Sequence, residues 1–423
     1  MCSVPMKLWF NRRASSCART STLRARSVNR SNNSDSLDGS AWATVYRAGP
    51  STWHRHAAAR VASPTAPLHD PDLGIARSQR AWRIVQSVNA PDLFALAVPD
   101  AELARIESCL HRVVELGDPF LDQITTHLID AGGKRLRPAL TVASASLGAT
   151  ARDWTDATEE TLLGGVAVEL VHLASLYHDD VMDEATRRRN VVSVNARWGN
   201  LLAIVAGDFL LARSAEIAAS LGNEVAGLLA STLARLCKGQ VAEVRAAYQI
   251  DRTEQEYIGA IADKTAALMS TACRIGAITA SLTSEQVEIV TTFGECLGMV
   301  FQIRDDVLDV LASEQELGKP PGQDLAEGIY TLPVQRALQD RGTGPALREL
   351  LGRPLGPDEV TEARTIVASS PGIADAAVVA RDYAIDAIDA ARSLGDGPVP
   401  SALVQLAASL LEDLERSTRA LAS

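Results

Sequence analysis

The stretch from Leu170 to Arg189 reads LVHLASLYHDDVMDEATRRR and places acidic residues at the end of an otherwise apolar segment. Asp179 and Asp183 are four residues apart, so on a helix their carboxylates lie on one face, with Asp180 beside them. Like charges at this spacing mildly destabilise a helix, which indicates that a counter-ion is expected there. A single cluster of this kind can equally be a solvated helix face.

A second stretch, Phe301 to Val310 (FQIRDDVLDV), repeats the pattern with Asp305, Asp306 and Asp309. Two copies, each ending a largely apolar run, are harder to explain as surface decoration than one. Carboxylate oxygens at this helical spacing suit Mg²⁺ rather than zinc. Because Mg²⁺ typically bridges one or two carboxylates to substrate phosphates, the expected ligand is a diphosphate.

The charge of the chain is distributed unevenly. Residues 1–88 contain 13 Lys and Arg against 4 Asp and Glu, whereas the rest of the chain contains 28 against 48. An acidic body argues against nucleic acid as a partner, because phosphate backbones require a positive face. The six cysteines include no CxxC pair, which predicts reduced thiols and a cytoplasmic protein. No uninterrupted apolar run approaches the roughly 20 residues that span a bilayer, although a membrane can receive an apolar product.

Residues 1–88 differ from the rest of the chain. Arginines lie among Ser, Thr and Asn, without a helical or strand period. The composition is that of a transit peptide or of a nucleic-acid-binding arm. Alternatively, the start codon was assigned too far upstream and the segment is not translated. We expect this extension to be disordered and dispensable, and residues 89–423 to form the folded domain.

The chain from about Asp92 onward is a succession of helical patterns, so the predicted fold class is all-α. Gly- and Pro-rich breaks are expected at Ser313 to Gly328 and at Gly342 to Pro357. The nearly apolar stretch Leu201 to Leu221 is expected to be buried, with Asp208 as a buried helix partner. Helices are predicted at Asp100–Leu116, Phe120–Asp130, Pro138–Leu147, Glu159–Asp183, Leu201–Leu221, Glu224–Tyr248, Glu254–Leu282, Ser284–Ala312 and Thr331–Arg341, with two or three more from Glu359 to Ser423.

Cationic side chains accompany the acidic segments: Lys134, Arg137, Arg188, Arg189, Lys264 and Lys319. Taken singly, each can be an ordinary solvent contact. None lies in a GxxxxGK[ST] motif, which disfavours a nucleotide triphosphatase, and neither GxGxxG nor GxSxG occurs.

Together these motifs resemble the trans-isoprenyl diphosphate synthases, specifically the long-chain polyprenyl diphosphate synthase branch. The resemblance covers roughly residues 95–420. Several motifs occur in the family's order, which makes the resemblance specific. They are Gly133 to Pro138 (GKRLRP), His172 to Asp183 with Arg188 and Arg189, Gly207 to Phe209, Lys264 with Thr265, Phe301 to Asp309, Gly318 to Pro320 with Asp324 and Leu325, and Thr331 to Pro333.

The resemblance implies a single helical bundle around a deep central cavity, with both aspartate segments at its rim. It implies that Mg²⁺ is held by Asp179, Asp183, Asp305, Asp306 and Asp309. Isopentenyl diphosphate would be bound without metal by Lys134, Arg137, His172 and Arg189. The allylic diphosphate, farnesyl or geranylgeranyl, would be contacted by Arg188, Lys264, Thr265 and Gln302. We expect a homodimer in the cytoplasm that makes a quinone side-chain precursor.

Product length can be argued from the first acidic helix. Side chains one turn before Asp179 project below the diphosphate, where a growing chain must pass. Ala174 and Ser175 occupy these positions, and in short-chain relatives aromatic residues close the passage near here. The small residues predict a product longer than geranylgeranyl diphosphate, unless another helix supplies the floor.

Some positions depart from the family pattern. Asn190, Val191 and Val192 replace a Gly-Lys-Pro-like turn, Ile329 stands where lysine is frequent, and Gln240 where glutamate is frequent. Histidine on an apolar helix is by default a core residue, so His178 is expected to be structural. The alternatives left open are a shorter-chain synthase, a terpene cyclase, and a non-catalytic subunit of a two-component synthase.

Overall fold

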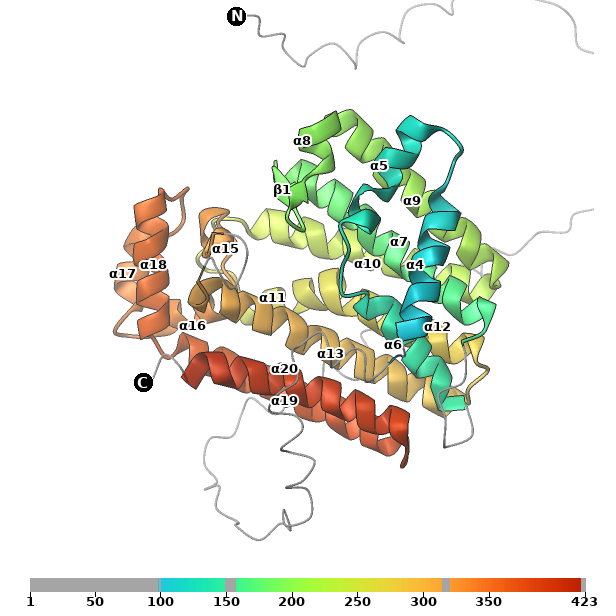
Figure 1. Cartoon of the computed structure of the whole chain (residues 1–423). Helices are drawn as coiled ribbons and strands as arrows, with labels where there is room; N and C mark the ends of the chain where they lie inside the picture. Colours follow the sequence, from blue (N-terminus) through green and yellow to red (C-terminus); the bar gives the residue numbers. More distant parts are fainter. Residues whose placement is uncertain (1–97, 99, 149–156, 314–319, 420–423) are drawn as a thin grey trace, which may run out of the picture. The chain divides into compact units, whose positions relative to one another are not determined.

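The computed structural model describes residues 98, 100–148, 157–313 and 320–419. Within these ranges the chain is almost entirely helical, as predicted, and the extension expected at residues 1–88 lies outside them. Figure 1 gives the element labels that are used below. The helices are α4 (Asp100–Val114), α5 (Pro119–Asp130), α6 (Leu136–Ala145), α7 (Glu159–Met182), α8 (Val194–Trp198), α9 (Asn200–Ser220), α10 (Asn223–Ala246), α11 (Glu254–Ile261), α12 (Ala267–Thr279), α13 (Ser284–Leu311), α15 (Gln323–Ala326), α16 (Leu332–Gln339), α17 (Gly344–Leu350), α18 (Pro357–Ser369), α19 (Gly372–Ser393) and α20 (Pro398–Arg419), with a 3₁₀ turn, η1 (Ser146–Gly148), after α6.

Local signals fix several helix starts. Asp118 caps α5 by accepting the N–H groups of Phe120 and Leu121, and Pro119 follows it at the first helical position. Thr253 and Thr283 each form a capping box, at the starts of α11 and α13. These predicted boundaries are therefore correct to within a few residues. The short helices α15 and α17 were missed, because they lie inside the two stretches read as breaks.

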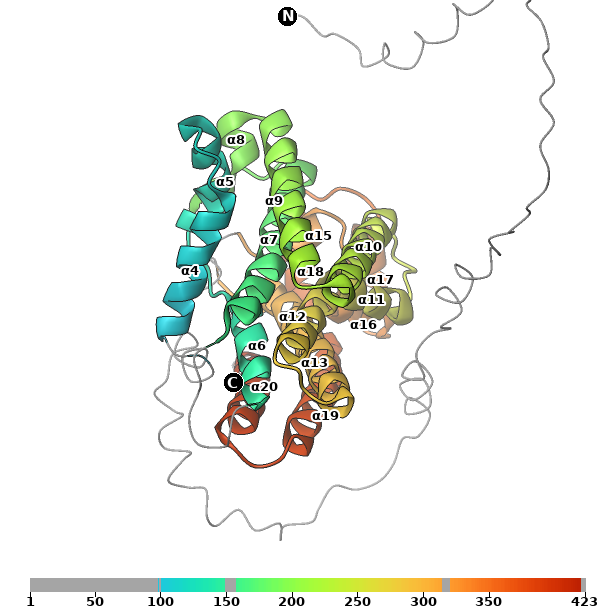
Figure 2. The same cartoon turned by 90° about the vertical axis from the view of Figure 1, so that its right-hand side faces the viewer.

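Two apolar clusters form the interior, and α13 belongs to both. The larger cluster joins α4, α6, α7, α9, α12 and the first half of α13. The smaller one joins the second half of α13 to α16, α18 and α19. In Figure 1 the hairpin of α19 and α20 lies along α13. Figure 2 shows α7 between its neighbours, and it packs on α9, α6 and α12.

Helix α7 combines length and apolar character. It has 24 residues and is the one helix within the described residues that is long and apolar enough to cross a membrane. Most of its most apolar window, 72%, is buried inside the bundle. Burial of this extent is what the central helix of a packed bundle shows.

Helix α9 contradicts two predictions. Leu201, Ile204 and Val205 are exposed, and the side chain of Asp208 is 67% accessible rather than buried. The expectation of a buried helix was wrong because α9 is apolar on nearly all sides, whereas α7 and α10 cover only part of its circumference. Composition alone cannot tell which apolar face a neighbour covers.

Candidate active site

The first aspartate segment forms the last turn of α7, with Asp183 as its C-cap. Asp180 is fully buried and accepts a hydrogen bond from Arg188 Nε at 2.7 Å. Asp179 is half-buried and Asp183 is exposed. Burial, with the charge of Asp183, raises the pKa of Asp179 to about 6, although Lys264 opposes the shift. Because the carboxyl end of a helix already carries partial negative charge, these two carboxylates call for a cation.

Arg188 and Arg189 belong to a small hairpin that follows α7. Strand β1 (Arg187–Arg188) pairs antiparallel with β2 (Val191–Val192). Arg189 and Asn190 connect them, and both have positive φ, 49° and 64°, as a type I′ turn requires. Asn190 to Val192, which replace the Gly-Lys-Pro-like turn of the family, thus form a turn of another type. This turn still presents both arginines.

The second aspartate segment lies near the end of α13, and its members have different surroundings. Asp306 is buried and accepts hydrogen bonds from Gln302 Nε2 at 2.7 Å and Tyr257 Oη at 2.5 Å. Burial raises the pKa of Asp306 to about 7, although both hydrogen bonds oppose the shift. Asp309 is also buried and accepts the backbone N–H of Asp324 at 3.2 Å. Asp305 is the more accessible member and contacts Arg304 at 3.0 Å.

Lys264 and Thr265 link the two acidic segments. They lie in a π-helical turn, η2 (Ala262–Ala266), between α11 and α12. Lys264 forms an ion pair with Glu243 of α10. Burial lowers the pKa of Lys264, but Glu243, Asp179 and Asp183 together raise it above its ordinary value.

Thr265 makes the link to the second segment. Its hydroxyl donates to Gln302 Oε1 at 2.7 Å, and Gln302 in turn donates to Asp306. The adjacent residues Lys264 and Thr265 therefore interact with different acidic segments. Such π-helical turns are frequent at functional sites.

Two glycines allow neighbouring helices to close on this turn. A Cβ on Gly239 of α10 would lie 2.6 Å from the backbone nitrogen of Lys264. A Cβ on Gly298 of α13 would lie 2.5 Å from Cα of Ala266. The turn is therefore clamped between backbones, which fixes where Lys264 and Thr265 project.

A basic cluster lies at the start of α6. Arg189 donates to the carbonyls of Leu128, at 2.9 Å, and Gly132, and its charge acts on both Arg137 and His172. Burial, with the charges of Arg137 and Arg189, lowers the pKa of His172 well below its ordinary value, so the imidazole is neutral at pH 7. The Nε of Arg137 is buried without a hydrogen-bond partner. A buried guanidinium with an unused donor fits an anionic ligand.

Acidic support for this cluster was missed from the sequence. Arg135 is buried and binds Glu107, Glu169 and the carbonyl of Ile129, so its role is structural. Glu169 is buried on α7 and raises the pKa of Arg137 against the effect of burial. A lone acid inside the apolar run of α7 was the available signal. Lys134, predicted beside Arg137, has an exposed side chain.

The two positions proposed to set product length face different ways. His178 packs on Gly207 of α9, and Ala174, one turn earlier on the same face, is fully buried. Ser175 is one turn before Asp179 on the aspartate face and is half-buried. Its hydroxyl donates to the carbonyl of His172 at 2.8 Å. Ser175 is therefore the member of the pair that lies directly below the carboxylate.

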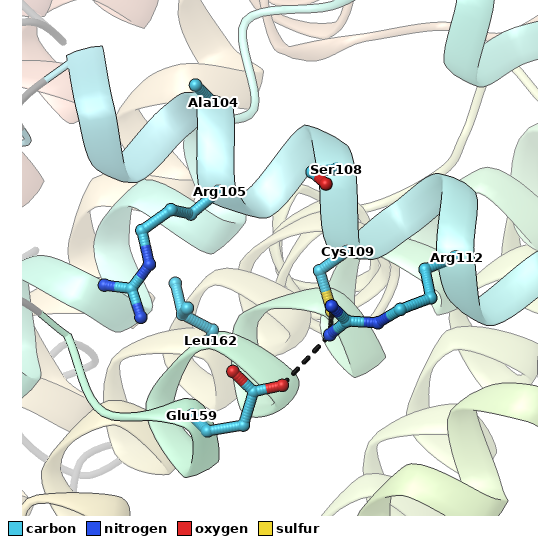
Figure 3. Close-up of a pocket in the computed structure, with 7 residues that line it drawn as sticks. All are labelled: Ala104, Arg105, Ser108, Cys109, Arg112, Glu159 and Leu162. Carbon is cyan, nitrogen blue, oxygen red and sulfur yellow. Dashed lines mark hydrogen bonds and ion pairs between the residues drawn. The ribbon is translucent and has the colours of Figure 1, made fainter.

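A separate pocket of about 300 Å³ lies between α4 and the start of α7 (Figure 3). Arg112 spans it and contacts Glu159 at 3.0 Å. Because Glu159 and Asp179 are at opposite ends of α7, some 30 Å apart at 1.5 Å per residue, this pocket is remote from the acidic segments. Its lining residues are Ala104, Arg105, Ser108, Cys109, Arg112, Glu159 and Leu162.

The acidic segments offer carboxylate oxygens to a metal ion. Among residues 98, 100–148, 157–313 and 320–419, no three His, Cys, Asp or Glu side chains converge closely enough to hold an ion alone. Mg²⁺ commonly takes only one or two carboxylates and completes its shell with water and substrate phosphates. The oxygen-only donors and the raised pKa of Asp179 fit such a cation.

A family model described as Polyprenyl synthetase matches residues 118–367, more than half of the chain. The chain belongs to this family. Nonaprenyl diphosphate synthase of Mycobacterium tuberculosis is 40% identical over 325 residues, covering 76% of this chain and 96% of that protein. Heptaprenyl diphosphate synthase component 2 of Geobacillus stearothermophilus is 37% identical over 299 residues, covering 70% and 89%.

A solved structure gives the same result for the fold. The polyprenyl synthase of Caulobacter crescentus, complexed with calcium and isoprenyl diphosphate, has a TM-score of 0.71 and 29% identity, and the match covers 76% of this chain and 97% of that chain. The predictions of an all-α isoprenoid-synthase bundle and of a long-chain polyprenyl diphosphate synthase are therefore confirmed. The protein is a prenyl-transferring enzyme.

Proposed function

We propose that this enzyme condenses isopentenyl diphosphate with farnesyl or geranylgeranyl diphosphate, and repeats the step to make a long all-trans polyprenyl diphosphate for a quinone side chain. One observation carries the proposal: Lys264 and Thr265 are adjacent, yet one interacts with the α7 carboxylates and the other connects to Asp306. A diphosphate between the acidic segments would meet both.

The residues divide the two substrates between them. Arg137 and Arg189, together with the neutral His172 on which their charges act, would bind the diphosphate of isopentenyl diphosphate. Lys264, Thr265, Gln302 and Arg188 face the allylic diphosphate. Asp179, Asp183 and Asp305 would hold Mg²⁺, with Asp306 and Asp309 supporting that side. When bound, Mg²⁺ supplies Lewis-acid stabilisation of the leaving diphosphate.

The chain's own residues account for the rest of the reaction. The allylic C–O bond breaks and its electron pair leaves with the diphosphate, whose charge Lys264 stabilises by preorganised electrostatics. The double bond of isopentenyl diphosphate attacks the allylic carbon, and a proton is lost to the departed diphosphate. Apolar residues of α7 exclude water, which would otherwise capture the carbocation.

The decisive experiment is product chromatography. The purified chain is incubated with Mg²⁺, isopentenyl diphosphate and farnesyl diphosphate. Linear products longer than geranylgeranyl diphosphate support the proposal. A cyclic hydrocarbon identifies a terpene cyclase, products that stop at geranylgeranyl diphosphate identify a shorter-chain synthase, and turnover only after adding another subunit identifies a two-component enzyme.

Aspartate variants test the metal assignment. Asp179→Asn and Asp305→Asn should each reduce turnover on the order of 100-fold, because transition-state charge stabilisation is lost. Asp382→Asn, at an exposed position of α19, is the matched control and should retain normal turnover. Near-normal rates in Asp179→Asn would remove that residue from the mechanism.

We also propose that residues 89–423 are the catalytic unit, that the enzyme is cytoplasmic, and that it acts as a homodimer. The nonaprenyl diphosphate synthase match occupies nearly all of that relative but only 76% of this chain, which supports a dispensable extension. Deletion of residues 1–88 should leave the turnover number unchanged. A large loss of turnover in the deleted protein would assign the extension a catalytic role.

A further inference from the structure

Arg252 has no role in the site described above, yet its surroundings are unusual. It lies in the segment between α10 and α11 and is 8% exposed. Its Nε is buried without a hydrogen-bond partner. Removing a guanidinium from water is costly, and leaving one of its donors unused adds to the cost. A structural arginine would be expected to use these donors.

Arg135 provides the comparison within the same chain. It is 4% exposed and donates to Glu107, Glu169 and the carbonyl of Ile129. The N–H groups of its guanidinium are thus hydrogen-bonded within the protein. Arg252 is similarly buried, but the protein leaves its Nε–H available. The contrast distinguishes a packing arginine from one that is prepared for a ligand.

The neighbours of Arg252 are the acidic residues of the α13 side of the site. Its guanidinium carbon lies 5.6 Å from the ring centroid of Tyr257, whose hydroxyl binds Asp306. Burial lowers the pKa of Arg252, while the charges of Glu243 and Asp306 oppose that shift. Glu243 is also the ion-pair partner of Lys264. Arg252 and Lys264 therefore share an acidic neighbour.

The position of Arg252 is fixed by contacts on both sides of it. Tyr248 has a left-handed backbone and donates its N–H to the carbonyl of Gly328 at 2.8 Å. A Cβ on Gly328 would lie 2.5 Å from the ring of Tyr248, so only glycine permits this approach. On the other side, Thr253 caps α11 through a capping box with Glu256. Both anchors hold Arg252 beside the second aspartate segment.

The described residues of the α13 side, 301–313 and 320–330, offer no unpaired cation of their own. Arg304 is the basic residue of the segment Phe301 to Val310, and Asp413 and Asp305 engage it. Residues 320–330 contain no Lys or Arg, and Ile329 is aliphatic. The described cations of the site, Lys264 and Arg188, are paired with Glu243 and Asp180. Among the described residues on this side, Arg252 is therefore the cation without an ion-pair partner that a diphosphate approaching Asp306 would meet.

We propose that Arg252 is a further substrate-binding residue, which contacts the diphosphate of the allylic substrate from the α13 side. This inference rests on the proposed function of the site. Its guanidinium would supply a second charged donor in addition to Lys264, with which it shares Glu243 as a neighbour, so two cations would hold the leaving group. Arg252 then stabilises the same developing charge without taking part in proton transfer.

Binding of inorganic diphosphate in the presence of Mg²⁺, measured by calorimetry, tests the inference directly. Arg252→Gln should weaken binding about 10- to 100-fold. Arg245→Gln, at an exposed position in the last turn of α10, is the matched control and should bind as the wild type does. Unchanged diphosphate affinity in Arg252→Gln would overturn the proposal.

Kinetics separate binding from a purely structural role. Arg252→Gln should raise KM for the allylic diphosphate and leave KM for isopentenyl diphosphate unchanged. Equal increases in both values, with a lowered melting temperature, would contradict the proposal. If the wild type binds diphosphate but makes no prenyl product, the proposed function fails while the binding comparison still decides the role of Arg252.

Arg252→Lys covers the case in which the glutamine variant does not fold. In arginine-¹⁵N-labelled wild-type protein, the Nε–H resonance of Arg252 is identified by its loss in Arg252→Lys. Adding Mg²⁺ and diphosphate should shift this resonance. A resonance that stays in place at saturating diphosphate would exclude the contact.

Discussion

At the scale of single residues, the site is a set of buried charges whose partners come from other helices. Asp180, Asp306 and Asp309 are the buried members of their segments and are hydrogen-bonded within the protein. Asp179 is only half-buried, and although burial raises its pKa to about 6, the nearby Lys264 opposes that shift. The two segments consist of the same residue type, but their aspartates have different surroundings. The buried aspartates are hydrogen-bonded within the protein, whereas the more accessible ones can bind a cation.

Asp179 gives a prediction for the metal-free protein. Because its folded pKa of about 6 exceeds the ordinary value of about 3.9, the folded state holds the proton more tightly, and stability falls as pH rises from about 4 to about 6. With a chelator present, Asp179→Asn should be more stable than wild type at pH 7 by roughly 1–3 kcal/mol. Below about pH 4 the two should converge. Urea unfolding at several pH values checks this, and a pH-independent difference would contradict it.

Ser175 gives a prediction for product length. A phenyl ring at this position lies one turn below Asp179 and should block the growing chain, so Ser175→Phe should shorten the products while retaining turnover. Ser175→Ala is the control and should leave the products unchanged. Chromatography of the products measures both. Unaltered lengths in Ser175→Phe would place the floor on another helix.

Ala174 should respond differently to the same substitution. It is fully buried on the face of α7 that meets α9, so a phenyl ring there overfills the core. Overpacking of this kind costs about 1–3 kcal/mol. We therefore expect Ala174→Phe to lower the melting temperature more than Ser175→Phe does. Thermal unfolding of the two variants decides it, and equal melting temperatures would place both side chains in similar space.

At the scale of elements, the π-turn η2 is the part that assembles the site. Its widened turn interrupts what the sequence indicates as one helix, Glu254 to Leu282. Helices α10 and α13 then close on it through Gly239 and Gly298. Because Lys264 and Thr265 are adjacent within this turn, small shifts of its backbone alter contacts to both acidic segments.

Gly239→Ala tests this element. The added methyl would meet the backbone of Lys264, so the turn must move, and we expect a loss of about 1–3 kcal/mol together with reduced turnover. Gly227→Ala is the matched control in the same helix, because nothing lies within 4 Å of its Cβ. It should stabilise the protein by about 0.5–1 kcal/mol through helix propensity. Equal effects in both variants would show that the turn tolerates displacement.

At the scale of the whole molecule, the exposed face of α9 is the feature that needs a partner. Leu201, Ile204 and Val205 are 74%, 42% and 52% exposed, and they lie at helical spacing on one side. Exposed apolar surface of this kind marks interaction sites. A second copy of the chain is the occupant we propose.

Light scattering after gel filtration tests the homodimer. The wild type should have twice the chain mass of 45.0 kDa, and Val205→Glu should shift the population to monomer. Val378→Glu, at a position 50% exposed on α19, is the control and should stay dimeric. A monomeric wild type that binds lipid vesicles through α9 would instead assign this face to a membrane.

The sequence by itself determined most of the helices and the family, and it supplied the candidate residues of the site. Helix starts such as Thr253 and Thr283 depend on contacts within a single turn, so local patterns predict them. The acidic segments are likewise readable, because their spacing is that of one helix face.

Only the tertiary structure decided which carboxylates are buried, which face of α9 stays exposed, and where the π-turn interrupts its helix. The links from Thr265 to Gln302 and from Tyr257 to Asp306 join residues 37 and 49 positions apart. The roles of Arg252 and Glu169 likewise depend on contacts between helices that are distant in the sequence. The physical reason is that burial and charge depend on what packs across a helix face, and that information is not local in the chain.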